Sequence, residues 1–299
     1  MTRAAFARCW HSSFPRRFAI SPEAAWHQAY GSEHFRPDWS AELYHQAGEA
    51  AAILVAKQGT QSGTAHVSAL LGEPMPARTL LSECLHTMCA CGVHTVRFGS
   101  DPDHFWPGAP VGVSWLSELL VQAGFTLGSE IYDMGRDLDD YAPLGTADAL
   151  GASVVRCNPA DVPALGRFLT AEFPGRWETD TVRKAAEDPG DIFILLVDGT
   201  IQGFTVTQTP RSKRPHAGAV FRSDLGFDWC ALGPIGVAAT LRGKRLGDAL
   251  LSEALLSLRE TGGRDCTIDW TVLTEFYGRH GFRPTATYRA AELRLAPVS

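Results

Sequence analysis

The sequence predicts an α/β fold, in which a mixed central sheet is flanked by helices, present as two tandem copies. Three observations predict it. Leu80–Leu85 (LLSECL) matches Leu250–Leu255 (LLSEAL) at an offset of 170 residues, and both stretches have the apolar spacing of an amphipathic helix. Each is followed by a short strand-like segment and then by a second helical segment. Both halves close this series with the same dipeptide, Gly124-Phe125 in the first and Gly281-Phe282 in the second.

The elements of the second half follow in a regular order. A strand pattern and a helical pattern lead to a hairpin turned at Asp198-Gly199, then to a strand, a helix and another strand. A short helix follows, and the closing segment Arg283–Leu295 is predicted to form two more strands. The expected bounds are Ser153–Cys157 (strand), Pro159–Phe173 (helix), Asp191–Val197 and Thr200–Thr209 (hairpin), Trp229–Val237 (strand), Leu246–Glu260 (helix) and Cys266–Trp270 (strand). In the first half the matching strand is Thr95–Phe98.

The chain length and the positions of prolines and glycines predict where the two copies divide. A chain of 299 residues suits two domains of about 150 residues. Prolines and glycines between residues 140 and 152 interrupt both periodicities, so we expect a domain at 1–145 and another at 150–299. The first eighteen residues hold four arginines and no acid, but lack the apolar core of a secretory signal. This favours a disordered or loosely attached segment over a transit peptide.

Composition excludes some classes of function. The net charge of −6 argues against a general nucleic-acid binder, and no run approaches the roughly 18 apolar residues of a membrane span. Seven cysteines without a secretory signal indicate reduced thiols in a cytoplasm. A metal site is not expected, because Cys89 and Cys91 would point about 200° apart on a helix. Asp101 and His104 lie among prolines that indicate a rigid loop.

The most informative segment lies between residues 235 and 248. A strand ends at Val237, a short basic loop containing Gly243 follows, and an amphipathic helix begins at Leu246. The free N–H groups and positive dipole end of a helix start favour anions, and glycine lets a ligand approach the backbone closely. The loop therefore suits a pyrophosphate; the alternative is a surface loop with ordinary basic residues.

Two motifs here resemble the GNAT superfamily of N-acetyltransferases. The cofactor motif of that family is Gln/Arg-x-x-Gly-x-Gly/Ala, and Arg242 fills its first position and Gly247 its last. Arg245 stands at the fourth position, where glycine is usual; backbone donors survive there if the local angles are helical. The segment Phe276–Phe282 is similar to the family's Tyr-x-x-x-Gly-Phe sequence. The resemblance covers Ser153–Leu295 and implies a GNAT fold.

The resemblance also implies acetyl-CoA as co-substrate and an amine on a small molecule or peptide as acceptor. The strand at Ile235–Val237 would offer backbone groups to the pantetheine arm, and Arg242–Asp248 would hold the pyrophosphate. The cofactor-binding residues so implied are Ile235, Gly236, Val237, Arg242, Gly243, Lys244, Arg245, Leu246, Gly247 and Asp248. The asparagine and alanine often found before the tyrosine are replaced by Trp270 and Leu273, which predicts different acceptor contacts.

Two residues are the candidate catalysts. By the resemblance, Tyr277 would protonate the departing thiolate, a role open to a phenol of pKa about 10; packing in a helix is the alternative. An alkyl ammonium has a pKa of about 10.4, so the acceptor must lose a proton. Asp269, at the end of its strand, and Asp228, beside Trp229, are the candidate bases, and for each a solvated or capping carboxylate is the alternative. A water relay to a backbone carbonyl is a further route.

Other residues carry weaker predictions. Phe173 and Trp177 border the acceptor cleft by family analogy, or simply pack. A basic hairpin loop is predicted to be a solvated turn, with an anionic acceptor or partner as the alternative; it holds Arg211, Lys213, Arg214, His216 and Arg222.

The first copy has lost the features of the second. The 170-residue offset places Gly72–Ala77 on the basic loop, where two prolines remove N–H donors and Glu73 adds repulsion. Leu120 takes the place of the tyrosine. We therefore expect a degenerate first copy that does not bind acetyl-CoA.

Three functions remain open on the sequence. The preferred one is an N-acetyltransferase in which the amine attacks acetyl-CoA directly in a ternary complex. A catalytically impaired module that binds CoA or a protein is the second. A tandem peptidyl transferase using aminoacyl-tRNA is the third, disfavoured by the acidic charge. The acceptor and the oligomeric state are not predicted.

Overall fold

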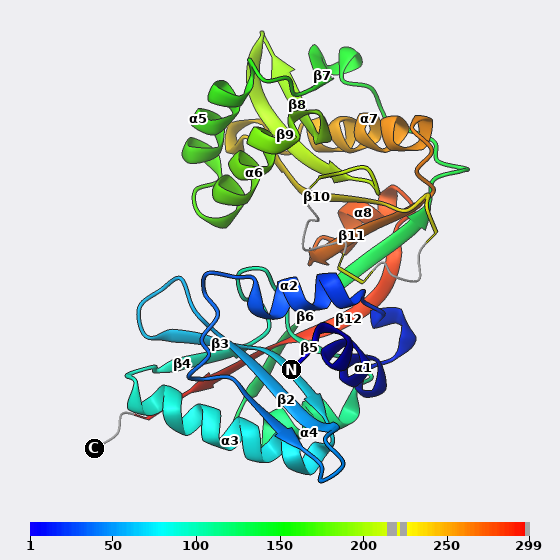
Figure 1. Cartoon of the computed structure of the whole chain (residues 1–299). Helices are drawn as coiled ribbons and strands as arrows, with labels where there is room; N and C mark the ends of the chain where they lie inside the picture. The colour runs from blue at the N-terminus through cyan, green and yellow to red at the C-terminus, as the bar shows by residue number, and fades with distance from the viewer. Residues whose placement is uncertain (214–219, 222–225, 297–299) are drawn as a thin grey trace. The chain divides into compact units, whose positions relative to one another are not determined.

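The computed structural model of the protein describes residues 1–213, 220–221 and 226–296. The chain forms two compact α/β units (Figure 1). Unit 1 comprises Met1–Tyr132, Val220–Asp224 and Ala286–Ser299, and unit 2 comprises Asp133–Ala219 and Leu225–Thr285. The end of the chain thus returns to the unit in which the chain begins. The division into copies at 1–145 and 150–299 remains a prediction.

Unit 2 is built on a mixed sheet with the strand order β6-β11-β10-β9-β8-β7. Strands β7, β8, β9 and β10 pair antiparallel, whereas β10 and β11 pair parallel. The elements, in chain order, are β7 (Ala152–Arg156), α5 (Val162–Glu172), α6 (Arg176–Glu187), β8 (Ile192–Val197), β9 (Thr200–Gln208), β10 (Cys230–Val237), α7 (Leu246–Glu260), β11 (Asp265–Thr271) and α8 (Thr274–Arg279). The end of β6 (Thr126–Asp137) completes the sheet.

Helices cover both faces of this sheet. A Cβ added to Gly236 of β10 would lie 2.5 Å from the ring of Phe173, which follows α5. The next side chain, Val237, points the other way and lies near Gly247 of α7. Leu165 and Leu169 of α5 are buried in a core that includes Phe204 of β9. The sheet therefore presents one face to α5 and the other to α7.

Most predicted elements of this half are confirmed. The helix Leu246–Glu260 has the expected bounds, and the hairpin turns at Asp198 and Gly199, which both have positive φ. The prediction of two closing strands is wrong, because Arg283–Arg294 forms one strand, β12. Its only backbone-restricting residue is Pro284 near its start, so nothing interrupts the strand.

Unit 1 has the strand order β1-β2-β3-β4-β12-β6. Residues Ala291–Arg294 of β12 pair antiparallel with β4, so the last strand lies within this sheet. The elements are α1 (Arg3–Ser13), α2 (Pro22–Tyr30), β1 (Ala41–Tyr44), β2 (Ala50–Gln58), β3 (Thr64–Gly72), α3 (Pro74–Ala90), β4 (Thr95–Phe98), β5 (Ala109–Pro110) and α4 (Ser114–Gln122). Short 3-10 turns occur at Arg16–Phe18, Asp148–Leu150, Pro189–Asp191 and Ala239–Leu241.

The expectation of a disordered or loosely attached segment at residues 1–18 is wrong. Helix α1 begins after Thr2, whose hydroxyl accepts a hydrogen bond from the N–H of Ala5. Phe6 and Trp10 are fully buried, and the rings of Trp10 and Trp106 stack with centroids 4.8 Å apart. The aromatic side chains at 6, 10, 14 and 18 recur every four residues, which is the signal of a buried helical face that the arginines obscured.

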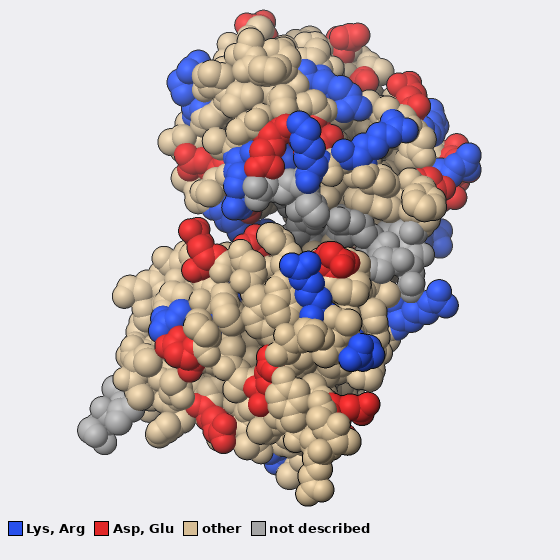
Figure 2. Space-filling model, in the orientation of Figure 1, with Lys and Arg blue, Asp and Glu red and all other residues tan. Residues whose placement is uncertain are grey.

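Two features of the described residues concern their surroundings: the distribution of charge on one face and the hydropathy of the helices. On the face shown in Figure 2, basic and acidic side chains are interleaved on unit 2, as on an ordinary solvated surface. Among the described residues, no helix combines the length and the apolar character needed to cross a bilayer.

Candidate active site

A break in the sheet of unit 2 creates the candidate site. Within the described residues, the parallel ladder of β10 and β11 joins Cys230 to Cys266 and Ala231 to Thr267 and then stops. Strand β10 continues to Val237 beside β9, with an irregularity between Leu232 and Ile235. From Leu232 onward, β10 and β11 therefore separate and leave an edge of β10 facing β11.

The register of β10 fixes which backbone groups face this opening. The N–H of Ala238 donates to the carbonyl oxygen of Gln202, so residues at even positions direct their N–H groups toward β9. Alternation along a strand then directs the N–H groups of Ile235 and Val237 toward β11. Two of the three strand residues expected to bind the cofactor thus offer polar backbone groups to the opening. Gly236 does not, and its α5 face is covered by the ring of Phe173.

A cavity of about 400 Å³ lies at the start of α7, directly after this strand. That volume falls within the range of small-molecule sites. Helix starts leave N–H groups without intrahelical partners, and here these belong to Leu246, Gly247 and Asp248. The lining residues are Val237, Leu241, Arg242, Gly243, Arg245, Leu246, Gly247, Asp248, Phe276 and Arg279.

Most of the predicted cofactor residues meet at this cavity. All of Arg242–Asp248 except Lys244 lie in its lining, and Val237 does too. Arg242 is held by a hydrogen bond from its Nε to the carbonyl oxygen of Val237, 3.2 Å away. Its guanidinium also lies 6.0 Å from the ring centroid of Phe173. Lys244 does not line the cavity, so a direct role for it is less favoured than one for Arg242.

Arg245 does not have the helical angles expected of it. Its φ of 61° and ψ of 8° place it in the left-handed region, as the N-cap of α7. Its carbonyl oxygen accepts the first helical hydrogen bond, from the N–H of Ala249 at 3.1 Å. Glycine adopts this conformation freely and other residues adopt it with strain, which explains why glycine is usual at this position. The loop therefore keeps its shape with arginine, but at a conformational cost.

Asp248 binds protein groups rather than solvent. Its side chain is buried, and its Oδ1 lies 2.8 Å from a terminal nitrogen of Arg279 and 3.2 Å from Nε2 of His280. Burial raises the pKa of Asp248, but hydrogen bonds and positive charge from these two residues outweigh it and lower that pKa overall. Only the N–H of Asp248 is suited to an anion. Arg279 was not predicted, because its position is set by a contact 31 residues away.

The two candidate catalysts lie close enough to interact. Tyr277 of α8 is buried, with its ring packed edge-on against Phe276 and Phe282. Burial is the main cause of a raised pKa of Tyr277, and the negative charge of Asp269 raises it further. Asp269 stands on β11 and its Oδ1 lies 3.8 Å from where a Cβ on Gly233 of β10 would be. Asp269 is thus placed in the opening between the strands.

Asp228, the alternative base, precedes β10 and lies at the end opposite Val237. Its carbonyl oxygen accepts a hydrogen bond from the N–H of Arg264, and its carboxylate lies 4.0 Å from Nε of the same arginine. Its surroundings favour a structural role.

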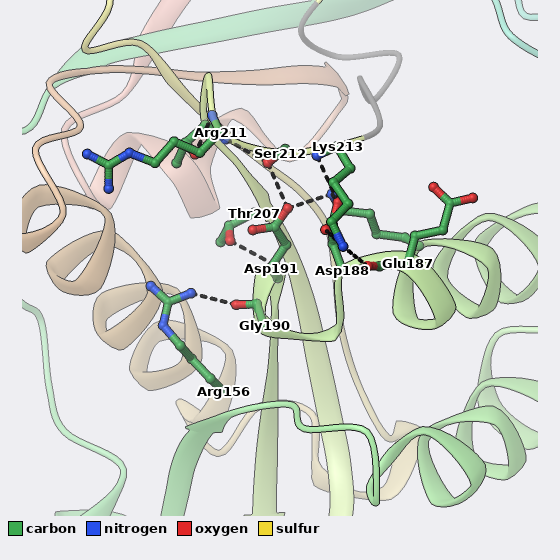
Figure 3. A network of polar contacts seen from close by, with 11 residues as sticks. Arg156, Glu187, Asp188, Gly190, Asp191, Thr207, Arg211, Ser212 and Lys213 are labelled. Atoms are coloured by element: carbon green, nitrogen blue, oxygen red, sulfur yellow. Dashed lines mark hydrogen bonds and ion pairs between the residues drawn. The ribbon is translucent and has the colours of Figure 1, made fainter.

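The described part of the basic hairpin loop is tied to unit 2 by ion pairs (Figure 3). The N–H of Lys213 donates to Asp188, and the Ser212 hydroxyl donates to Asp191. Both carboxylates also bind the buried ammonium of Lys184, at 3.1 and 2.5 Å. Lys213 is therefore already paired. Arg214, His216 and Arg222 lie outside the described residues.

Aromatic rings of α6 and of the segment before it lie beside the sheet of unit 2. Trp177 of α6 is partly exposed and packs against Phe173. The guanidinium of Arg176 lies 4.3 Å from the ring centroid of Trp270, at the end of β11. Phe173 thus packs directly on β10, and Trp177 packs on Phe173 and on Phe204 of β9.

The corresponding opening in unit 1 is filled. Strands β3 and β4 pair from Thr64 to Val67 and from Thr95 to Phe98, and the chain after β4 turns back. Asp101 in that turn is fully buried and accepts hydrogen bonds from Lys57 and Ser68 at 2.6 Å each. Helix α3 begins with Pro74 and has no basic loop before it. These features support the proposal that the first copy is degenerate.

Comparison with known proteins identifies the fold. No protein-family model and no curated protein matches the chain. Among solved structures, a GCN5-related N-acetyltransferase from Sphaerobacter thermophilus aligns with 100% of this chain and 95% of its own, with a TM-score of 0.72 and 18% identity. A tandem GNAT protein from the clavulanic acid biosynthesis pathway aligns with 99% of this chain and 94% of its own, with a TM-score of 0.66 and 15% identity.

A third similar structure is part of a much longer protein. It is the GCN5-related glucosamine N-acetyltransferase region of a fungal multi-domain GH3 β-N-acetylglucosaminidase, with a TM-score of 0.77 and 18% identity. The match covers 90% of this chain but only 36% of the fungal chain. At these identities the likeness concerns the fold. The chain has the GNAT fold, in two tandem copies.

Proposed function

We propose that unit 2 is an acetyl-CoA-dependent N-acetyltransferase that transfers the acetyl group to a primary amine in a ternary complex. The observation that carries this proposal is the cavity at the start of α7, which combines arginine side chains with helix N–H groups directly after an open strand edge. Such a site suits the pyrophosphate of CoA. The open edge of β10 suits the amide groups of the pantetheine arm, which would pair with it as an added strand does.

The acetyl transfer follows from this placement. The amine nitrogen attacks the thioester carbonyl carbon, a tetrahedral intermediate forms, and the carbon–sulfur bond breaks to release the thiolate of CoA. Binding both reactants in one opening supplies proximity and orientation. An N–H of Ile235 or Val237 that faces β11 is suited to stabilise the negative oxygen of the intermediate.

Tyr277 is assigned to the leaving thiolate. Its raised pKa keeps the phenol protonated at neutral pH, so a donor is always present. The same shift makes complete proton transfer to a thiolate uphill. The assigned role is therefore a hydrogen bond to sulfur as the carbon–sulfur bond breaks, with the phenol proton moving to sulfur while a proton released by the amine replaces it, so that no free phenolate forms.

Asp269 is assigned to the proton of the amine. Its carboxylate lies in the opening between β10 and β11 and interacts with Tyr277 through its charge. A carboxylate there attracts the acceptor ammonium and accepts a proton directly or through water. The ammonium loses one proton to Asp269 before attack, and Asp269 passes it to solvent. The nitrogen loses a second proton, through water, as the intermediate collapses, and this proton replaces the one that Tyr277 gives to sulfur, so that the amide and the CoA thiol form and Tyr277 is regenerated.

The test is release of CoA thiol from acetyl-CoA with a panel of primary amines on small molecules and peptides. We expect at least one amine to accelerate release over hydrolysis. Folded Arg242→Glu protein, in which the anion site carries a reversed charge, is the control and should lose this activity at low acetyl-CoA. Tight CoA binding without release by any amine would instead support the impaired module.

A further inference from the structure

Arg279 is held in a fixed position at the cavity that the proposed function assigns to the pyrophosphate. It is the last residue of α8, about half exposed, and it lines the cavity together with Arg242 and Arg245. Its guanidinium lies 2.8 Å from Asp248 and 5.5 Å from the ring centroid of Phe276. A charged anchor on one side and a ring on another restrict the rotamers of a long side chain, which lowers the entropy lost on ligand binding.

The contact with Asp248 leaves most N–H donors of Arg279 available to a ligand. A guanidinium has five N–H donors, and the contact with Asp248 engages one terminal nitrogen. Asp248 is buried and remains ionised, because Arg279 and His280 offset the effect of burial on its pKa. Burial lowers the pKa of His280, and the hydrogen bond and charge of Asp248 act in the opposite direction.

The charges around the cavity match a doubly charged anion. Three guanidinium groups and one carboxylate line it, and the carboxylate is paired with Arg279. The cavity therefore keeps an excess of positive charge, which suits the two negative charges of a diphosphate.

We propose that Arg279 is a ligand of the cofactor's diphosphate and that buried Asp248 is the positioning residue that holds it there. This rests on the proposed function and extends it. The ligand then bridges the start of α7 and the helix α8, which carries Tyr277 two residues before Arg279. Diphosphate binding thereby adds to the contact between Asp248 and Arg279, which already joins the start of α7 to the helix of the candidate acid.

Calorimetric titration of the full chain with CoA, 3′-dephospho-CoA and pantetheine tests the proposal. Arg279→Gln should weaken CoA and 3′-dephospho-CoA equally, by about ten-fold or more, because each loses a charge-assisted hydrogen bond. Pantetheine lacks the diphosphate, and its affinity should not change. Arg183→Gln is the matched control, since Arg183 is similarly exposed and also lies 2.8 Å from an aspartate, Asp180, but on α6 away from the cavity. It should bind CoA as the wild type does.

A double-mutant cycle tests the positioning role. Asp248→Asn should weaken CoA several-fold in the wild type and add no further loss in the Arg279→Gln variant, because both changes remove one interaction. Additive losses, or an equal loss for pantetheine, would indicate general disruption of α8 and overturn the inference. Unchanged CoA affinity in folded Arg279→Gln protein would overturn it too. A wild-type chain that binds no CoA would overturn the proposed function itself, and the two failures are therefore distinct.

Discussion

Replacing Arg245 by glycine should stabilise the protein while weakening its cofactor site. Arg245 has a φ of 61°, in the left-handed region, at the turn between the basic loop and α7, where its carbonyl oxygen accepts the first helical hydrogen bond. This region costs a residue with a β-carbon about 1–2 kcal/mol, and glycine avoids that cost. Glycine also lowers the free energy of unfolding by about 0.5–1 kcal/mol, because it has greater conformational freedom in the unfolded chain. The net expectation is a gain of about 0.5–1 kcal/mol in the free energy of unfolding.

The same change removes a guanidinium from the cavity lining. We expect the dissociation constant for CoA to rise about ten-fold, the effect of one charge-assisted hydrogen bond. Arg245→Ala separates the two effects, because alanine removes the charge and keeps the β-carbon. It should bind CoA as weakly as the glycine variant and unfold at about the wild-type denaturant concentration.

Chemical unfolding of the three proteins, with CoA titrations on the same samples, provides the measurement. If the glycine variant is no more stable than the alanine variant, the left-handed conformation of Arg245 is not a source of strain. If the glycine variant binds CoA more tightly than the wild type, Arg245 hinders the ligand and is not part of its site.

The other predictions concern the cleft, the loop and the count of sites. Tyr277→Phe should lower acetyl transfer by about 10²–10⁴ and leave CoA affinity within a few-fold; wild-type turnover would remove its assigned role. Arg242→Glu should weaken CoA far more than Lys244→Glu, because only Arg242 lines the cavity, and equal effects in titrations would contradict this. CoA should bind with one site per chain, and two equivalent sites would refute a degenerate first copy. Gly236→Ala should destabilise unit 2 by about 1–3 kcal/mol through overlap with the Phe173 ring, measured by denaturant unfolding; Phe173→Leu should restore part of the loss.

Much of unit 2 could be predicted because its signals are local. The helix Leu246–Glu260, the loop before it and the glycine-bounded hairpin depend on apolar periodicity, charge and turn residues that lie together in the chain. The role of Asp248 was not predictable in this way. Its place in the motif indicated a group near the phosphates, but its carboxylate is directed to α8 by a contact with Arg279.

The remaining differences also arise from contacts distant in sequence. Phe173 covers Gly236 although the two lie 63 residues apart, and no local pattern indicates that approach. The left-handed angle of Arg245 is imposed by the strand-to-helix turn against the preference of the residue. At the N-terminus the signal is local, since Phe6 and Trp10 begin a four-residue aromatic repeat, but the arginines of the same segment favour disorder.

The path of β12 has a consequence for how the chain acquires its structure during synthesis. Residues Ala291–Arg294 pair with β4, which is about two hundred residues earlier in the chain. A ribosome therefore exposes the edge of β4 long before its neighbour is translated, and unit 1 cannot close its sheet until translation has passed through all of unit 2. Unit 2 lacks this delay for its strands from β7 to β11, which pair soon after they emerge. The segment made first is thus the one completed last, and the unpaired edge of β4 is open to aggregation in the interval.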